Sequence, residues 1–246
     1  MDAYTLHLQQ ASSAFTMSSR KAGEDFTTQL ARHSDVVSFT EVHAHSHALA
    51  LATACDHAGY QLVRDAEGDV AVAVKGIHKV HTWGVAQSVP GHPGPAAAGG
   101  HGPRNILWVT FQPFGTRERV THHAAHWVTR KADTGLQQLQ MTADLGDVVA
   151  AHSQGSRLGF WSGDTNSPDR PHDVTKVDKA LRKAELTSCW DELGKWPATH
   201  EASTIDVIGS YDPDHRVDCV RGRRWPPGHS DHRAVSAWYR ISPVRA

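Results

Sequence analysis

The clearest pattern along the chain is a short hydrophobic run that stops abruptly at glycine and polar residues. Leu158 to Ser162 is mostly apolar, and Gly163, Asp164 and Asn166 follow at once. A run bounded in this way is typical of a buried strand whose end carries polar side chains to the rim of a sheet. We therefore expect a strand here. An ordinary strand followed by an Asx turn is the structural alternative.

Hydrophobic periodicity predicts the other elements. Alternating or continuous apolar stretches predict strands over residues 4–10, 35–40, 60–64, 69–75, 105–111, 119–128, 203–209, 216–221 and 234–241. Helical spacing of apolar residues predicts helices over 20–33, 46–57, 136–152, 173–183 and 184–193. The Gly, Pro, Ala and His content of residues 87–103 predicts a loop. Since there is no internal repeat and no second core, we expect one domain over residues 1–246.

Composition limits the possible functions. The chain has 246 residues, of which 39% are hydrophobic and 21% charged, as is ordinary for a soluble globular protein. Its formal net charge of -1 provides no overall field that would attract nucleic acid. Any binding of phosphate must therefore come from a few basic side chains or from bound cations.

Histidine and cysteine usage points to a reducing compartment. The three cysteines are too few and too scattered for a disulfide scaffold or a zinc finger. Most of the 19 histidines are expected in loops or on the surface, although His43, His45 and His47 are spaced so that they could bind a transition metal adventitiously. Because we find neither a signal peptide nor a run of transmembrane length, we expect a cytoplasmic protein that does not enter a membrane.

Four short motifs occur in an order that one enzyme superfamily shares. They are Asp35-Val36-Val37-Ser38-Phe39-Thr40-Glu41-Val42, Ser162-Gly163-Asp164-Thr165-Asn166, Thr204-Ile205-Asp206-Val207-Ile208 and Ser230-Asp231-His232. Each is weak alone, but the ordered set resembles the endonuclease/exonuclease/phosphatase superfamily, deoxyribonuclease I type, over nearly the whole chain. The resemblance implies an α/β (α+β) sandwich of two packed, mostly antiparallel sheets flanked by helices. It also implies phosphoester hydrolysis with a divalent cation, Mg²⁺ or Mn²⁺.

The resemblance assigns a metal site and a base. Glu41 would ligate the cation, with Asp231 completing or supporting the site, since Mg²⁺ favours hard oxygen ligands. His232 would act as general base for the attacking water, with Asp206 orienting its ring. Whether one or two ions bind is left open by the sequence.

Further residues would contact the nucleophile or the phosphate. Asp164 and Asn166 would position one of them. Arg104 opens a strand similar to one that carries a phosphate-contacting arginine, although it could simply cap a strand edge. Among His122, His123 and His126 we favour His126, because the family's histidine ends its strand; His122 shares its face, whereas His123 points the other way.

The chain departs from the family pattern at three motif positions. The family's first strand normally ends in an asparagine near the metal and phosphate, whereas here the alternation from Tyr4 continues to Gln10, a longer amide. Thr40 and Thr204 replace a usual glutamine and arginine. Every expected acid and base is retained, so these departures concern metal geometry and substrate rather than reaction class.

A basic segment lies just before the last motif. Arg223, Arg224 and Trp225 should sit beside the site, where the arginines would contact DNA and the tryptophan would stack on a base or sugar. A solvated loop with Trp225 packed into its base fits the sequence equally well.

We therefore expect a magnesium-dependent phosphodiesterase, in the first place a DNA nuclease, with no obligate protein partner. A phosphatase or phosphodiesterase acting on a small molecule or a phospholipid headgroup would use the same core. A binding protein that kept the fold and lost activity is disfavoured, because such a protein has no chemical reason to retain the full set of acids and bases.

Overall fold

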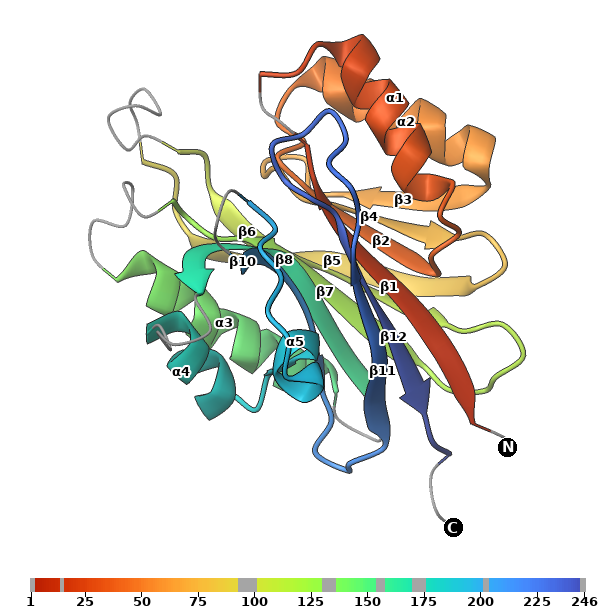
Figure 1. Cartoon of the computed structure of the whole chain (residues 1–246), viewed down its shortest axis with the longest axis vertical. Helices are drawn as coiled ribbons and strands as arrows, with labels where there is room; N and C mark the ends of the chain where they lie inside the picture. The colour runs from red at the N-terminus through yellow and green to blue at the C-terminus, as the bar shows by residue number, and fades with distance from the viewer. Residues whose placement is uncertain are drawn as a thin grey trace.

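Two six-stranded sheets pack face to face in the computed structural model, with helices on their outer faces (Figure 1). The structure describes residues 3–13, 16–92, 101–129, 136–153, 158–169, 176–200 and 204–243. The expected fold class, two packed and mostly antiparallel sheets flanked by helices, is confirmed.

The first sheet has the strand order β11-β12-β1-β2-β4-β3. Its strands are β1 (Tyr4–Ser12), β2 (Val36–Thr40), β3 (Tyr60–Arg64), β4 (Ala71–Lys75), β11 (Val217–Arg224) and β12 (Val235–Ile241). β1 and β2 run parallel, and the other neighbouring pairs are antiparallel.

The second sheet has the order β5-β6-β7-β8-β10-β9. Its strands are β5 (Lys79–Val89), β6 (Arg104–Gln112), β7 (Val120–His126), β8 (Leu158–Asp169), β9 (Thr187–Ser188) and β10 (Thr204–Tyr211). Here β7 and β8 form the parallel pair. Each sheet thus has its parallel pair near its middle.

Helices cover the outer faces. α1 (Ser19–Leu30) and α2 (His45–Ala58) lie on the first sheet, whereas α3 (Gln137–His152) and α4 (Lys176–Lys183) cover the second (Figure 1). The short α5 (Cys189–Leu193) packs against β10 and β11. Ser18 caps α1 by accepting a hydrogen bond from the Lys21 N–H, and α2 ends at Gly59, whose φ of 73° suits glycine.

Alternation along the strands divides the core. Leu6 and Leu8 point between the sheets, where they join Phe160 and Tyr239, and all four are at most 1% exposed. A second cluster beneath α1 and α2 contains Phe26, Phe39 and Leu51. No helix in the described part of the chain has the combination of length and apolar character needed to cross a bilayer.

Three predicted elements need correction. β5 was not predicted, and the predicted loop near 87–103 begins only after Val89, because the exposed alternation of β5 contains few large apolar residues. The helix predicted over 184–193 is reduced to α5, preceded by β9. The segment around Arg223 is not a loop, since β11 continues to Arg224. Residues 93–100, 173–175 and 203 of the predicted elements lie outside the described residues.

Candidate active site

Asp164 lies at the centre of a polar cluster between the sheets. It is in β8, in register with His126 of β7 and with Asp206 of β10. Residues in register on neighbouring strands project to the same face, so these three side chains point together toward the first sheet. Asp164 is 1% exposed, and this burial raises its pKa although nearby His232 and His126 lower it.

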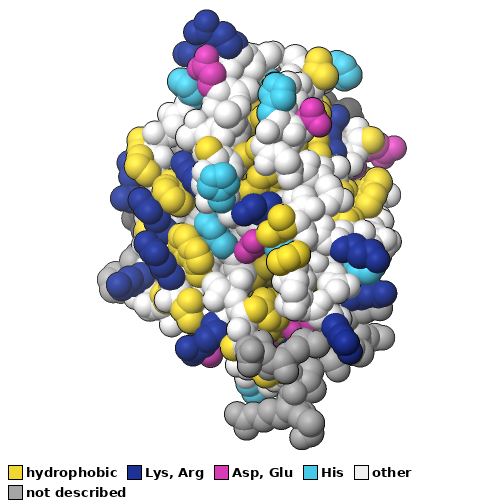
Figure 2. Space-filling model, turned by 90° about the vertical axis from the view of Figure 1, so that its right-hand side faces the viewer, with side chains coloured by type: hydrophobic (Ala, Val, Ile, Leu, Met, Phe, Trp, Pro, Cys, Tyr) yellow, Lys and Arg dark blue, Asp and Glu magenta, His cyan; other side chains and the backbone are white. Residues whose placement is uncertain are grey.

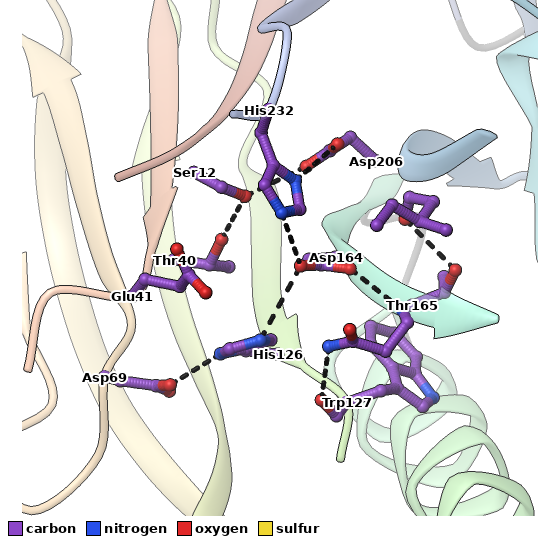
Figure 3. Close-up of polar contacts among 12 residues, drawn as sticks. Ser12, Thr40, Glu41, Asp69, His126, Trp127, Asp164, Thr165, Asp206 and His232 are labelled. Carbon is purple, nitrogen blue, oxygen red and sulfur yellow. Dashed lines mark hydrogen bonds and ion pairs between the residues drawn. The ribbon is translucent and has the colours of Figure 1, made fainter. Parts of the chain in front are cut away.

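Asp206 holds His232 from one side of the cluster. The Nδ1 atom of His232 lies 2.9 Å from Oδ2 of Asp206, and the other ring nitrogen, Nε2, lies 3.7 Å from Oδ2 of Asp164 (Figure 3). Ser12 at the end of β1 donates to Oδ1 of Asp206 at 2.9 Å, so both carboxylate oxygens are engaged. The carboxylate therefore has a fixed orientation, and it fixes the imidazole.

The charges around His232 favour its protonated form. Burial alone would lower the pKa, but the charge and hydrogen bond of Asp206, followed by the charges of Asp164 and Glu41, raise it to about 10. The histidine thus carries a proton at neutral pH in the free protein.

A second histidine–carboxylate pair faces Asp164 from the opposite side. Nδ1 of His126 lies 2.5 Å from Oδ2 of Asp69, and its Nε2 lies 3.6 Å from Oδ2 of Asp164 (Figure 3). Arg104 and His43 also pair with Asp69. Burial would raise the pKa of Asp69, but the positive charges of His126, Arg104 and His43 hold it well below its usual range.

Glu41 stands immediately after β2, beside this cluster. Its φ of 64° lies in the left-handed region, so the chain turns sharply there. Burial raises the pKa of its carboxyl to about 7; the charges of Asp164 and Asp231 also raise it, whereas His126 and His232 lower it. Asp231 has a side chain that is 66% exposed and lies 3.5 Å from Nε2 of His200.

Potential ligand atoms gather in three groups among the described residues. The groups are His43, Asp69 and His126; His200, Asp231 and His232; and Asp164, Asp206 and His232. All adjoin the cluster around Asp164, so this end of the sandwich has the atoms needed to bind a divalent cation. The predicted joint site of His43, His45 and His47 is not among these groups: His43 faces Asp69, and Nε2 of His47 lies 2.9 Å from the carbonyl oxygen of Met17.

Comparison with known proteins gives matches in structure alone. No protein-family model matches the chain, and no curated protein matches it either. An endonuclease/exonuclease/phosphatase from Bacteroides vulgatus superposes with a TM-score of 0.77 and 14% identity, covering 97% of this chain and 100% of that one. The chain has the endonuclease/exonuclease/phosphatase fold.

Other solved structures with this fold differ in what they act on. D. rerio TDP2 complexed with a single strand DNA product matches with a TM-score of 0.71 and 13% identity, over 96% of this chain and 98% of that chain. The Bacteroides thetaiotaomicron mannosyl-6-phosphatase Bt3783 matches with a TM-score of 0.68 and 14% identity, over 95% and 99%.

Within this fold, six predicted site residues lie near Asp164 or carry charges that act on its neighbours. His126, His232 and Asp206 contact one another or Asp164, whereas the charge of Glu41 acts on His232 and the charge of Asp231 acts on Glu41. Asn166, two residues along β8, donates its side-chain amide to the carbonyl of Trp127 at 2.9 Å, and its backbone N–H donates to Asp164. This backbone hydrogen bond to Asp164 is the contact expected of an Asx turn, which was the structural alternative for this segment. The strand does not end there, however, because β8 continues to Asp169.

Gln10 lies two residues before the end of β1 and is therefore deeper between the sheets than expected for a residue that contacts substrate. Its side chain is fully buried, and its amide donates weakly to Thr40 at 3.3 Å. Ser12, on the same face of β1, is the residue that reaches Asp206. The strand predicted from the sequence ends at Gln10 and therefore leaves out Ser12, although Ser12 continues the same alternation.

Arg104 does not lie on an open surface. It is 6% exposed and forms a buried ion pair with Asp69. Its guanidinium already has a carboxylate partner, and a direct contact between Arg104 and phosphate stays a prediction. Asp69 was also missed, since at the start of a predicted strand it is indistinguishable from a turn residue.

Arg223 and Arg224 end β11, and Trp225 follows directly and leads toward Ser230. Arg224 donates to the carbonyl of Ala198 at 3.0 Å. The Trp225 ring is half-buried and already has two guanidinium groups over it, those of Arg223 at 3.9 Å and Arg32 at 4.3 Å. This arrangement favours the alternative of a packed tryptophan over one that stacks on a base.

Proposed function

We propose that this protein is a divalent-metal-dependent phosphodiesterase, with DNA as its substrate. The observation that carries the proposal is the pair of histidine–carboxylate couples, His232 with Asp206 and His126 with Asp69, that face Asp164 from two sides (Figure 3). Hydrolysis of a phosphodiester requires a base for water, a donor for the leaving oxygen and neutralisation of charge.

Glu41 and Asp231 would hold the cation. Their oxygen atoms are the ligand type that Mg²⁺ and Mn²⁺ prefer. The carboxyl of Glu41 is desolvated, and its pKa is raised to about 7 by burial and by the charges of Asp164 and Asp231. A nearby positive charge would stabilise the ionised form of this carboxyl, so these residues fit the ion. When bound, the ion supplies Lewis-acid neutralisation of the phosphate oxygens.

His232 would accept the proton of the attacking water through Nε2, because Nδ1 is held by Asp206. Its pKa of about 10 depends partly on the charges of Asp164 and Glu41. Neutralising those charges lowers the pKa toward the range in which a base functions near neutral pH. Asp164 would then orient the water or the ring.

His126 would contact the leaving oxygen or a phosphate oxygen through Nε2 and stabilise the negative charge that develops there. Its Nδ1 is bound to Asp69, which is in turn held by Arg104. Arg104 thus supports this side of the site through Asp69, and its effect on phosphate is indirect. Asn166 fixes the chain around Asp164 through its bonds to Trp127 and to Asp164 itself.

DNA is the favoured substrate because exposed arginines of β11 lead to the His232 loop. A structural relative, TDP2, was solved with a single strand DNA product. A small phosphoester is the second candidate, since the mannosyl-6-phosphatase has the same fold. Figure 2 shows basic, acidic and histidine side chains intermixed over one face, so on that face no broad basic surface accompanies the local arginines.

A substrate panel tests the proposal. Purified protein is incubated with supercoiled plasmid, linear duplex, single-stranded DNA, RNA, a generic small phosphodiester and a generic small phosphomonoester, each with Mg²⁺, Mn²⁺ or chelator. We expect metal-dependent cleavage of DNA and of the small diester by the wild type and by the exposed control variant His57→Ala, and loss of both in His232→Ala. Turnover of phosphomonoesters alone would favour the small-molecule phosphatase, and full turnover in excess chelator would exclude the metal mechanism.

A further inference from the structure

Three arginines occupy the outer face of the first sheet beside α1. Arg221 and Arg223 of β11 pair with Trp238 and Ser236 of β12, and Arg32, which follows α1, lies over the ring of Trp225. We call Arg32, Arg221 and Arg223 the arginine face. The inner face of the same strands is occupied by α5, since Gly222 lies against Trp190 and Leu193.

Aromatic rings hold these arginines in place. Arg221 lies 4.8 Å from the ring of Trp238, which stacks on His7 from β1 at 4.1 Å with an interplanar angle of 11°. Arg223 and Arg32 lie against Trp225, whose indole N–H donates to Ser236 at 2.8 Å. Stacking restricts the side chains but leaves the edges of the guanidinium groups, where the N–H donors are, accessible to an anion. Arg32 already donates one N–H to Oε1 of Gln29 at 2.5 Å, so its remaining donors are the ones available.

The arginine face has positive charge that the protein does not neutralise by ion pairing. In the described part of the chain, none of its three members forms a salt bridge, whereas Arg20, Arg182 and Arg240 each pair with a carboxylate. Arg32 and Arg223 lie over the same ring. Burial lowers the pKa of Arg32, the charge of Asp25 raises it, and the charge of Arg223 lowers it by a smaller amount. An anion at this face would offset the positive charge that Arg223 adds beside Arg32.

A short segment of chain connects the arginine face with the candidate active site, since β11 ends at Arg224, eight residues before His232. The backbone N–H of Trp225 donates to the carbonyl of Ala234, two residues beyond His232. Arg221 and Arg223 follow each other along one strand with a separation of roughly 7 Å, since a strand rises about 3.3 Å per residue. This separation is comparable with that of neighbouring phosphates in an extended nucleic-acid strand.

We propose that the arginine face binds the phosphate backbone of a single-stranded nucleic acid and leads that strand to the site at His232. The inference rests on the proposed phosphodiesterase function for the reaction, but the binding it describes is separate from catalysis. In this arrangement Trp225 and Trp238 position arginines, and the contacts to the substrate are to phosphate rather than to bases, so little sequence preference is expected.

Binding without cleavage is the direct test. Fluorescence anisotropy of a labelled single-stranded oligo-dT is measured in chelator at several salt concentrations for the wild type, Arg221→Ala/Arg223→Ala and the control Arg20→Ala/Arg182→Ala. Both double variants lower the net charge equally, but the control removes arginines that are ion-paired. We expect about tenfold or greater loss of affinity and a salt slope smaller by about 1.4 in the first variant, because each lost phosphate contact to a single strand reduces the slope by about 0.7.

Two further measurements keep the outcomes distinct. Thermal unfolding and hydrolysis of the small phosphodiester should be unchanged in Arg221→Ala/Arg223→Ala, and Arg221→Lys/Arg223→Lys should bind with intermediate affinity because it retains charge without the planar stack. Equal affinity in the first variant and the control would overturn the proposal. If the oligonucleotide result holds while no phosphodiester is cleaved by the wild type, the arginine face stands and the proposed function fails.

Discussion

The hydroxyl of Ser12 lies 2.9 Å from Oδ1 of Asp206, so a residue at the end of the first strand orients the carboxylate that holds His232. The two residues are 194 positions apart in the sequence and belong to different sheets. This contact makes Ser12 a positioning residue.

Replacing Ser12 with alanine should therefore lower kcat for a small phosphodiester by roughly tenfold with little change in KM, since a hydrogen bond to a charged group contributes about 1.5–3 kcal/mol and Asp206 would lose one. Ser210→Ala, farther along β10, is the matched control and should leave kcat unchanged. A change in KM with constant kcat would contradict the positioning role.

Replacing Asp206 with asparagine should lower the pKa of His232 from about 10, because the Asp206 charge is the largest contribution that raises it. NMR titration of the His232 ring measures this shift directly. Since the folded pKa exceeds the ordinary value of 6.5, the stabilisation from this pair is complete below pH 6.5 and is lost as pH rises toward 10. In Asp206→Asn the free energy of unfolding should depend less on pH between these values. Turnover should fall by about 10² or more. An unchanged titration would rule out the pairing.

Replacing Arg104 with methionine should destabilise the fold, because it leaves the Asp69 carboxylate buried and deprived of one partner. Breaking a buried pair in this way costs about 3–5 kcal/mol, whereas the exposed pair of Arg182 with Asp191 contributes about 1 kcal/mol or less. Urea unfolding of Arg104→Met and Arg182→Met compares the two. If Arg104 were instead an open phosphate contact, its loss would weaken DNA binding and leave unfolding unchanged.

Two buried histidines should make the protein sensitive to acid. Burial lowers the pKa of both His122 and His123 to about 3, below the value of 6.5 for an exposed histidine. The unfolded chain therefore binds more protons as pH falls from 6.5 toward 3, and stability is lost over that range at up to about 1.4 kcal/mol per pH unit for each group. His122→Gln keeps a polar group near Ser38 and Ser162 and should reduce the slope, as measured by unfolding at several pH values. A variant with the wild-type slope would count against this account.

Metal binding should require Glu41 in its ionised form. Because burial raises the pKa of Glu41 to about 7, affinity for Mg²⁺ should increase as pH rises through 7. A saturating ion stabilises the native state by about 2.7 kcal/mol at a hundredfold excess over Kd, so the wild type should gain thermal stability with Mg²⁺. Glu41→Gln should lose this gain, whereas the exposed Glu67→Gln should retain it. Equal stabilisation of both variants would place the ion elsewhere.

Most of the strands were predicted from hydrophobic patterns such as the alternation of Leu6 and Leu8 and the apolar run at Leu158, because these patterns follow directly from which faces are buried. The fold class was implied by the resemblance of four ordered motifs to one superfamily. The same motifs predicted Glu41, Asp164, Asp206 and His232 as site residues, and their roles in catalysis stay predictions. β5 escaped prediction because its residues are largely exposed on both faces and therefore show little hydrophobic pattern.

What only the tertiary structure decided is which polar residues meet. Ser12 and Asp69 belong to no motif, and each acquires a role only because the parallel pairs β1/β2 and β7/β8 bring strand ends to one end of the sandwich. The sequence shows only that Arg104 is basic, which would suit a contact with phosphate or an internal ion pair. The tertiary structure buries it against Asp69, with which it forms an ion pair. Local sequence determines which face of a strand a side chain occupies, whereas contacts between distant strands depend on how the two sheets pack, and that information is spread over the whole chain.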